Sequence, residues 1–325
     1  MQHLKISILT PAAPGSLAGN RTTAERWAAL LADAGLHVQT CHNQAPADTD
    51  LLIALHAWRS AEAIQDFRQR HPDRPLILAL TGTDLYHFQH SDPAPTLASM
   101  SAANTLIGLH RLVADAVPEA LRNKLHIVYQ SATDDGRHPE PAAGTFEVCV
   151  LGHLRDEKDP LRAAEAARNL PDGSHIRIIQ AGKAHSPEWA EQAKREMAAN
   201  PRYHWCGELG QVATRDLLKR SRLMVISSRM EGGANVVSEA CITGTPMLAS
   251  DIPGNRGLLG DDYAGYFPLE DSAALRQLLL RAEQDRGFLA QLRQQVRERA
   301  ALFCPAREQQ SLLHVIDKAL EVTDA

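Results

Sequence analysis

The sequence predicts an α/β protein made of two doubly wound domains, each with a parallel sheet. Short apolar strands alternate with amphipathic helices, which is typical of a doubly wound fold. Several strands are apolar at every position, as expected for a parallel sheet that is buried on both faces. A polar stretch rich in Pro, Asp and Gly, residues 131–145, separates two such series. The length of 325 residues also suits two cores better than one.

The N-terminal half begins with a strand and a helix. Trp27, Leu30, Leu31 and Ala34 recur at helical spacing, and Gly35 is placed to end that helix. Two continuous apolar strands follow, with the sequences LLIAL and LILAL. The predicted elements of this half are a strand at 5–11, a helix at 22–35, strands at 37–41 and 50–57, a helix at 60–71 and a strand at 75–84.

The second half repeats this alternation and ends in a long helical tail from about Ser272, which Pro305 is expected to break. We predict domains at 1–142 and 143–303, and a C-terminal helix at 304–325 that packs back toward the first domain. Two such domains would face each other across a cleft. The predicted strands are 146–154, 175–182, 203–209, 223–228 and 246–250, and the predicted helices are 159–170, 187–200, 213–221 and 235–244.

Composition and charge argue against several classes of protein. The net charge is −5 with both signs interspersed, which gives no basic surface for nucleic acid. The longest apolar runs are too short to cross a bilayer, and the N-terminal apolar strand is shorter than the roughly 7–15 residues of a secretory signal. The five cysteines form no C-x-x-C pair, which favours reduced thiols. We therefore expect a cytoplasmic protein without a nucleic-acid partner or membrane insertion.

The stretch SSRMEGGANVVSEA, residues 227–240, contains a glycine pair between two glutamates. It follows a buried strand and opens a helix, and the carboxyl ends of parallel strands face the ligand crevice. Gly232 and Gly233 permit positive φ and a close approach of the backbone. Free N–H groups at the start of a helix attract phosphate. Here those groups belong to Ala234, Asn235 and Val236. A diphosphate is therefore the expected ligand of this turn.

The two glutamates suit the sugars on either side of a diphosphate. An ionised carboxylate only accepts hydrogen bonds, and sugar hydroxyls donate them. Glu239, about one turn into the helix, would accept from a ribose diol, and Glu231 would accept from a transferred hexose. The alternative is that both are solvated helix-start residues, where acidic side chains are favoured. A glycosidase also needs two carboxylates, but the glycine pair between them favours phosphate.

A second turn follows the first strand of the second half. Gly152 makes the turn, and Arg155 and Lys158 place cations beside another helix start. A positioned cation stabilises a departing diphosphate. The alternative is that both cations lie on an ordinary surface turn.

Three loops of the N-terminal half also follow strand ends and should face the crevice. The first, GNRTT, opens a helix and suits an anion. His56 follows the second strand and is the candidate for handling protons or phosphate, although most such histidines are structural. The expected acceptor contacts are Gly19, Asn20, Arg21, Thr22, Arg59, Thr81, Gly82 and Thr83.

No metal site is expected. The motif DTD at residues 48–50 has the spacing of a metal-binding D-x-D, but it precedes its strand and is interpreted as a turn. The fifteen histidines show no spacing typical of a zinc site on a helix.

Taken together, these features resemble the GT-B type, nucleotide-sugar-dependent glycosyltransferases, which have two Rossmann-like domains facing an interdomain cleft. The resemblance implies that Glu239 holds the ribose, that Glu231 and the backbone of residues 232–235 hold the donor sugar and diphosphate, and that the backbone near Leu209 receives the base. It implies no metal or other cofactor. The family usually has Arg directly after the glycine of the phosphate turn. Here that position is His153, so either His153 or Arg155 supplies the second cation.

A finer resemblance runs along nearly the whole chain. The segments GNRTTAERWAALL, LIALHAWRSA, LTGTDLY, GHLRDEKDP, SRMEGGANVVSEA and LLGDDYAGYF together resemble the selenosugar synthases of selenoneine biosynthesis. This resemblance implies a carbon–selenium bond formed between a UDP-sugar, UDP-N-acetylglucosamine, and selenophosphate, with loss of UDP and phosphate. A selenolate-like nucleophile needs no general base. The alternatives are a transferase with a hydroxyl or thiol acceptor, a nucleotide-sugar-binding protein without activity, and a sugar-nucleotide epimerase.

Overall fold

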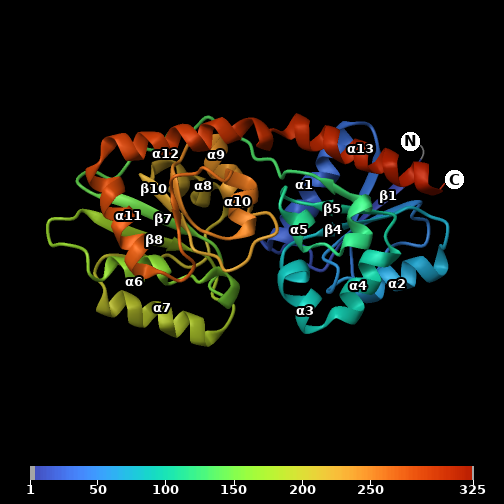
Figure 1. Cartoon of the computed structure of the whole chain (residues 1–325), viewed down its shortest axis with the longest axis horizontal. Helices are drawn as coiled ribbons and strands as arrows, with labels where there is room; N and C mark the ends of the chain where they lie inside the picture. The colour runs from blue at the N-terminus through green and yellow to red at the C-terminus, as the bar shows by residue number, and fades with distance from the viewer. Residues whose placement is uncertain (1–3, 324–325) are drawn as a thin grey trace. The chain divides into compact units, whose positions relative to one another are not determined.

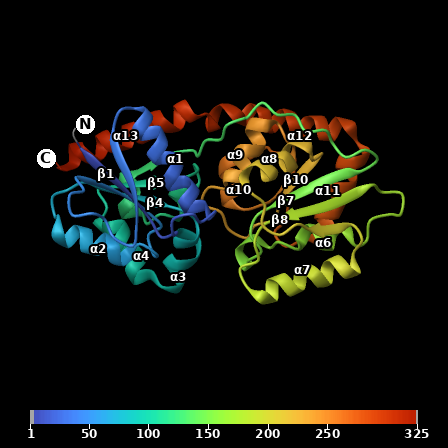
Figure 2. The ribbon, with the colours of Figure 1, turned by 180° about the vertical axis from the view of Figure 1, so that it is seen from behind.

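The computed structural model describes residues 4–323 and contains two six-stranded sheets with helices on both faces (Figures 1 and 2). The chain divides into two compact units. The first comprises the residues up to Ser131, the short segment Glu231–Asn235 and the residues from Leu302 onward, and the second comprises Ala132–Met230 and Val236–Ala301. Each unit is described by itself.

The sheet of the first unit has the order β2-β1-β3-β4-β5-β6, and every neighbouring pair is parallel. Its strands are β1 (Lys5–Thr10), β2 (His37–His42), β3 (Leu51–Leu55), β4 (Leu76–Leu80), β5 (Thr105–Gly108) and β6 (Leu125–Ile127). Its helices of ten residues or more are α1 (Gly19–Asp33), α2 (Ala61–Arg70), α4 (Pro93–Ala102) and α13 (Pro305–Thr323).

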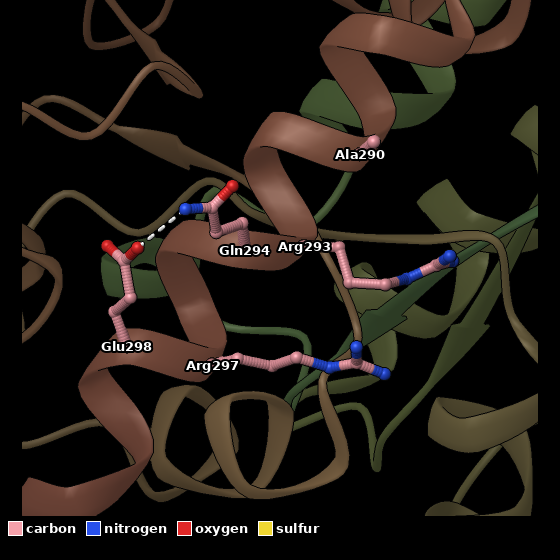
Figure 3. A pocket seen from close by; sticks show the side chains of 5 residues that line it. All are labelled: Ala290, Arg293, Gln294, Arg297 and Glu298. Atoms are coloured by element: carbon pink, nitrogen blue, oxygen red, sulfur yellow. Dashed lines mark hydrogen bonds between the residues drawn. The ribbon is translucent and has the colours of Figure 1, made fainter.

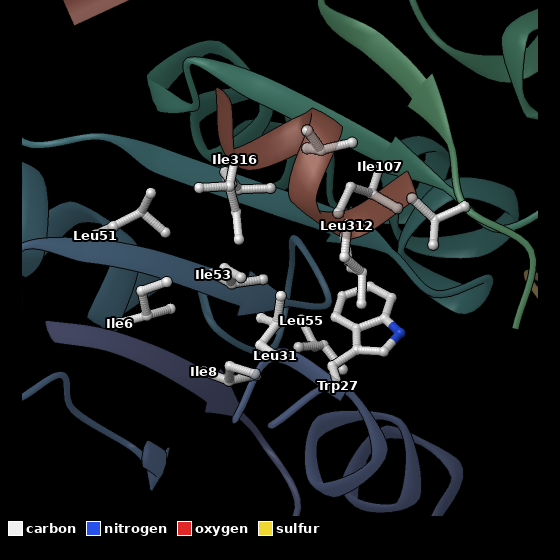
Figure 4. Close-up of a cluster of buried hydrophobic side chains, with 14 of the residues drawn as sticks. Ile6, Ile8, Trp27, Leu31, Leu51, Ile53, Leu55, Ile107, Leu312 and Ile316 are labelled. Carbon is white, nitrogen blue, oxygen red and sulfur yellow. The ribbon is translucent and has the colours of Figure 1, made fainter. Parts of the chain in front are cut away.

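The two apolar strands β3 and β4 are apolar throughout because each face of the sheet is covered. Alternate residues of a strand point to opposite faces. Leu51, Ile53 and Leu55 face a core built with α1 and α13, whereas Leu52 and Ala54 face a core built with α2 and α4. Figure 4 shows the first of these cores, where Trp27 of α1 and Leu312 of α13 lie beside the strands. The predicted burial on both faces is confirmed.

The sheet of the second unit has the order β12-β11-β10-β7-β8-β9 and is also parallel in every pair. Its strands are β7 (Phe146–Leu151), β8 (Ile176–Ala181), β9 (Tyr203–Trp205), β10 (Leu223–Ile226), β11 (Met247–Ser250) and β12 (Tyr266–Phe267). Its helices are α6 (Arg162–Ala167), α7 (Pro187–Ala199), α8 (Gln211–Arg220), α9 (Asn235–Thr243), α10 (Pro253–Leu259), α11 (Ser272–Gln284) and α12 (Arg286–Arg299).

Each sheet has one point at which the strand order reverses. In the second unit the chain proceeds outward from β7 through β8 to β9, then returns to β10 on the other side of β7. Ligands of open α/β sheets bind outside the carboxyl ends of the strands at such a reversal. We therefore expect a ligand near the loops that follow the adjacent strands β7 and β10. In the first unit the corresponding reversal lies between β1 and β3.

The predicted helical tail is broken more often than the sequence analysis proposed. α11 ends at Gln284, and Asp285 starts α12 by accepting hydrogen bonds from the N–H groups of Gly287 and Phe288. A short 3-10 helix, Ala300–Phe303, precedes α13, which begins at Pro305 as predicted. Proline suits this first helical position because its missing N–H would have no partner there.

Three further predictions can be compared with the structure. α1 starts at Gly19, earlier than predicted, and Gly35 follows it with φ +85°. Residues 128–142 form no regular element, in agreement with the predicted linker. β4 is followed by a π-helix, Asp84–Phe88, which the sequence analysis did not propose. None of the helices in the described part of the chain combines the length and apolar character that a bilayer crossing requires.

Candidate functional site

In the first unit, the loops after β3 and β4 are joined by a buried carboxylate. Asp84 is fully buried and accepts hydrogen bonds from the N–H groups of Ala57 (2.9 Å), Gly82 (2.8 Å) and Thr81 (3.0 Å). Asp84 also opens the π-helix, a type of element found frequently at functional sites. The sequence analysis did not assign Asp84 to the site, although its place at the end of TGTD was the available signal.

His56 lies in the same pair of loops, in a strained backbone conformation. It is 2% exposed and has φ +74°, a region that residues other than glycine seldom adopt. Its Nε2 lies 2.9 Å from Thr83 Oγ1, and its Nδ1 accepts from the N–H of Arg59 at 3.1 Å. The structure therefore brings His56 and Thr83 together, while the side chain of Arg59 is exposed.

The first predicted acceptor loop is less suited to an anion than the sequence suggested. Gly19 and Asn20 open α1, but the residue before them, Ala18, has no capping side chain. The guanidinium of Arg21 donates to Glu25 at 2.6 Å, and only 11% of its side chain is exposed. The hydroxyl of Thr22 donates to the carbonyl of Ala18 at 3.4 Å. Arg21 and Thr22 therefore already have partners within the protein.

The glycine pair lies in the segment Glu231–Asn235 of the first unit. A Cβ on Gly232 would lie 2.3 Å from the carbonyl carbon of Thr81, and one on Gly233 would lie 2.6 Å from Cβ of Leu109. Neither glycine has positive φ. Of the two properties that glycine permits here, close approach of the backbone is therefore the one that both glycines supply. Glu231, directly before them, is 8% exposed.

A buried carboxylate on α13 supports this segment. Glu308 is 1% exposed and accepts hydrogen bonds from Trp27 Nε1 (2.6 Å), Arg26 Nε (3.0 Å) and the N–H of Ser131 (2.7 Å). Arg26 in turn donates to Asn235 Oδ1 at 3.1 Å. The sequence analysis named neither Arg26 nor Glu308, because residues 282 positions apart give no local signal of their pairing.

In the second unit, the loops after β7 and β10 are tied together at the reversal of strand order. The hydroxyl of Ser227 donates to the carbonyl of Lys158 at 3.2 Å, and the N–H of Arg229 donates to the carbonyl of Glu157 at 2.8 Å. The side chain of Lys158 passes beside Gly152, with Cδ 3.9 Å from where a Cβ would lie. Arg229 belongs to the quoted motif SSRMEGG, but its role as a tie between loops was missed.

The loop after β8 approaches the turn at Gly152 without room for a side chain. A Cβ on Gly182 would lie 2.0 Å from the carbonyl oxygen of Gly152 and 2.9 Å from the nitrogen of His153. The next residue, Lys183, donates its N–H to His153 Nδ1 at 3.2 Å. The β7 loop is thus held at two places, by the β8 loop at Gly152 and His153 and by the β10 loop at Glu157 and Lys158.

His153 is a neutral donor rather than a cation near neutral pH. Burial lowers its pKa from the ordinary value, and the nearby positive charges of His185, Arg155 and Lys158 act in the same direction. Because Nδ1 accepts a hydrogen bond, the proton of the neutral ring lies on Nε2. Arg155 Nε lies 3.8 Å from Glu157 Oε2.

The remaining predicted donor contacts lie on α9 and after β9. α9 begins at Asn235, and Glu239 is half-buried one turn further on. Val236, between them, is half-buried, and Ala234 is 5% exposed. Leu209 is half-buried in the loop after β9, and its carbonyl accepts from the hydroxyl of Thr214 at 3.4 Å.

A hollow of about 440 Å³ is lined by residues of α12 (Figure 3). None of the predicted site residues lines it. Gln294 Nε2 donates to Glu298 Oε1 at 2.9 Å along its rim. The lining residues are Ala290, Arg293, Gln294, Arg297 and Glu298.

The acidic motif at residues 48–50 is a turn, as predicted. Asp48 pairs with Lys5 Nζ at 2.8 Å, and Asp50 accepts the N–H of Lys5 at 3.0 Å. Within residues 4–323, no group of three or more His, Cys, Asp or Glu side chains could hold a metal ion.

Comparisons with known proteins give the family. The profile of the family described as Glycosyl transferases group 1 matches residues 134–303, which is more than half of the chain. These residues include the β7, β8, β9 and β10 loops described above. No curated protein matches the chain.

Solved structures agree on the fold. HepE from Anabaena in complex with UDP is similar with a TM-score of 0.79 at 16% identity, over 97% of this chain and 100% of that one. The sucrose-phosphate synthase of Thermosynechococcus elongatus gives 0.81 at 15% identity, over 98% and 100%. A glycosyltransferase from Rickettsia africae gives 0.76 at 12% identity, over 98% of each chain. At such identities the likeness shows the fold alone, which is the GT-B fold. Because the family profile spans more than half of its length, the chain belongs to the group 1 glycosyltransferases.

Proposed function

We propose that this glycosyltransferase moves N-acetylglucosamine from UDP-N-acetylglucosamine to the selenium of selenophosphate. The observation that carries the transferase activity is the family match over residues 134–303. HepE, which shares the fold, was solved with UDP and with UDP-glucose, and this supports a UDP-sugar donor. The selenium acceptor rests on the sequence resemblance, whose most specific segments lie in the N-terminal half.

We assign the nucleotide to the reversal of strand order in the second sheet. Glu239 would accept hydrogen bonds from the ribose diol, and the backbone near Leu209 would receive the base. The N–H groups of Ala234, Asn235 and Val236 would bind the diphosphate at the start of α9. Support comes from the chain order, because these residues follow β9 and β10, and ligands of such sheets bind beyond the carboxyl ends of the strands.

We assign departure of UDP to the turn after β7. Lys158 and Arg155 would stabilise the charge that develops on the diphosphate. We name Arg155, rather than His153, as the second cation, because the lowered pKa of His153 keeps that ring neutral. His153 would still donate one hydrogen bond through Nε2–H.

The reaction balances without a proton acceptor on the protein. The bond between the anomeric carbon and the phosphate oxygen breaks, and its electron pair leaves with UDP. A lone pair of selenium forms the carbon–selenium bond, and water then takes the phosphoryl group from selenium to give phosphate and the selenosugar. Glu231 would orient the hexose through its hydroxyls.

UDP release tests the proposal. Purified protein is incubated anaerobically with UDP-N-acetylglucosamine, with and without selenophosphate, and the products are identified by mass spectrometry. We expect selenophosphate-dependent UDP release and a selenium-containing hexosamine, unchanged by EDTA. Release with glycerol or cysteine but not selenophosphate would favour a hydroxyl or thiol acceptor. Epimer formation without an acceptor would indicate an epimerase, and binding without any release would indicate a binding protein.

A further inference from the structure

The loops after β3 and β4 hold two buried titratable side chains, and the protein already uses both. The carboxylate of Asp84 accepts hydrogen bonds from the N–H groups of Ala57, Thr81 and Gly82, and it is fully buried. To take a proton from a substrate, Asp84 would have to release those N–H groups into a buried site, and an unsatisfied buried donor is strongly unfavourable. Asp84 therefore shapes the two loops and does not act as a base.

The hydrogen bonds of His56 fix its tautomer. The N–H of Arg59 can only donate, so His56 Nδ1 carries a lone pair. A neutral ring whose Nδ1 accepts a hydrogen bond carries its proton on Nε2. That N–H points to Thr83 Oγ1 at 2.9 Å. His56 is 2% exposed, so a second proton on Nδ1 would both break the bond to Arg59 and place a charge in a buried position. His56 is held as a neutral donor.

Because it accepts a hydrogen bond from His56, the hydroxyl of Thr83 can donate its own proton to another group. A hydroxyl has one proton and two lone pairs. Because His56 donates to Oγ1, the proton of Thr83 is directed to another acceptor. Thr83 is half-buried beside Gly82, at the carboxyl edge of the sheet, where the acceptor substrate is expected. In the same loop, Thr81 Oγ1 is buried and has no hydrogen-bond partner among the described residues.

We propose that His56 is a positioning residue that holds the Thr83 hydroxyl as a hydrogen-bond donor to the acceptor. This site then takes an acceptor that arrives ionised, with lone pairs to offer and no proton to lose, such as an oxo- or chalcogenophosphate anion. Alcohols and neutral thiols, which must be deprotonated during transfer, fit poorly. The inference rests on the proposed transferase function and defines its acceptor class.

Two other histidines, one after β5 and one on the π-helix, do not supply a base. His110 is fully buried, and burial lowers its pKa to about 4 even though the backbone and charge of Glu231 oppose that shift. Arg59 is a cation. His87 is exposed on the π-helix, and its ring packs against Phe88 at 4.8 Å between centroids. His87 therefore provides a control histidine on the π-helix that follows Thr83.

Variants separate a donor from a base. Glutamine at position 56 supplies an N–H near Nε2 but cannot take a proton, so His56→Gln should keep kcat/KM for selenophosphate within about fivefold, whereas His56→Ala should lose more. Thr83→Val should raise KM for the acceptor by about 10- to 100-fold, as expected for one hydrogen bond to a charged group, and Thr83→Ser should restore it. His87→Gln should match the wild type. UDP affinity checks that each variant is folded.

The pH profile and NMR distinguish a hydrogen-bond donor at position 56 from a general base. A general base of ordinary pKa would give kcat/KM a limb near pH 6.5, and that limb would vanish in His56→Gln. We expect identical pH profiles for the wild type and His56→Gln. The ¹⁵N spectrum should show His56 as the neutral Nε2–H tautomer between pH 6 and 8. A His56 that titrates in this range, or a His56→Gln variant as inactive as His56→Ala, would overturn the proposal.

The acceptor panel keeps this inference distinct from the proposed function. If thiophosphate supports UDP release and selenophosphate does not, the selenium assignment fails while the anionic acceptor stands. If only cysteine or glycerol supports release, both fail, because those acceptors must lose a proton. If no acceptor supports release, the proposed function fails, and the NMR tautomer alone decides the role of His56.

Discussion

Alanine at Gly182 should disturb the turn that we assign to the leaving diphosphate. The new Cβ would lie 2.0 Å from the carbonyl oxygen of Gly152, whereas carbon and oxygen in contact lie about 3.3 Å apart. The backbone must therefore move by roughly 1.3 Å, and both clashing partners are main-chain atoms that cannot rotate away. Overpacking of this kind costs about 1–3 kcal/mol. The φ of +155° at Gly182 adds to the strain.

Two assays measure the consequences. In a unit of this size, about 1 kcal/mol lowers Tm by about 2–4 °C, so Gly182→Ala should melt about 2–12 °C below the wild type. A displacement of about 1 Å at a reacting group costs on the order of 100-fold in rate, so UDP release should fall by a similar factor. Gly173→Ala is the matched control, because nothing lies within 4 Å of its added Cβ. A Gly182→Ala protein with unchanged Tm and unchanged turnover would refute the reasoning.

Four further predictions concern single side chains. Glu239→Ala should weaken UDP binding by about tenfold or more, since it removes a charged acceptor of hydrogen bonds from the ribose. Calorimetry that shows equal UDP affinity would contradict that role. Glu231→Ala should instead reduce turnover more than it reduces UDP affinity. Glu308→Gln should destabilise the protein by about 3–5 kcal/mol in urea unfolding, because it leaves the half-buried charge of Arg26 without its negatively charged partner. An unchanged midpoint would count against this prediction. Burial lowers the pKa of His110 to about 4, so as the pH falls the unfolded state binds this proton before the folded state does. The free energy of unfolding should therefore fall by up to about 3 kcal/mol between about pH 6.5 and about pH 4. His110→Gln should remove that part of the pH dependence, and wild type and variant with the same dependence of stability on pH would contradict the prediction.

Much of the fold could be predicted from local patterns in the sequence. The runs LLIAL and LILAL predicted strands buried on both faces, and β3 and β4 divide their side chains between two cores. The break at Asp285 could have been predicted, because an aspartate that caps a helix is a local signal. The π-helix after β4 could not, since it depends on Asp84 joining backbone from two loops.

At the candidate site, too, local motifs could be predicted from the sequence, whereas contacts between residues far apart in the chain could not. The glycine pair marked the right turn, but sequence alone does not distinguish a glycine needed for positive φ from one needed for close approach. Here the distinction depends on Thr81 and Leu109, which are remote in the sequence. The support of Asn235 by Arg26 and Glu308 is likewise a product of folding. The direction of the bond between His56 and Thr83 follows only from the backbone N–H of Arg59.

The most direct test of the account is UDP release from UDP-N-acetylglucosamine with selenophosphate, compared with the same reaction without an acceptor. The account predicts release that depends on selenophosphate, together with a product whose mass contains one hexosamine and one selenium. Release that is independent of selenophosphate and yields no selenium-containing sugar would contradict the proposed acceptor, and it would leave the chain a group 1 glycosyltransferase with a different partner.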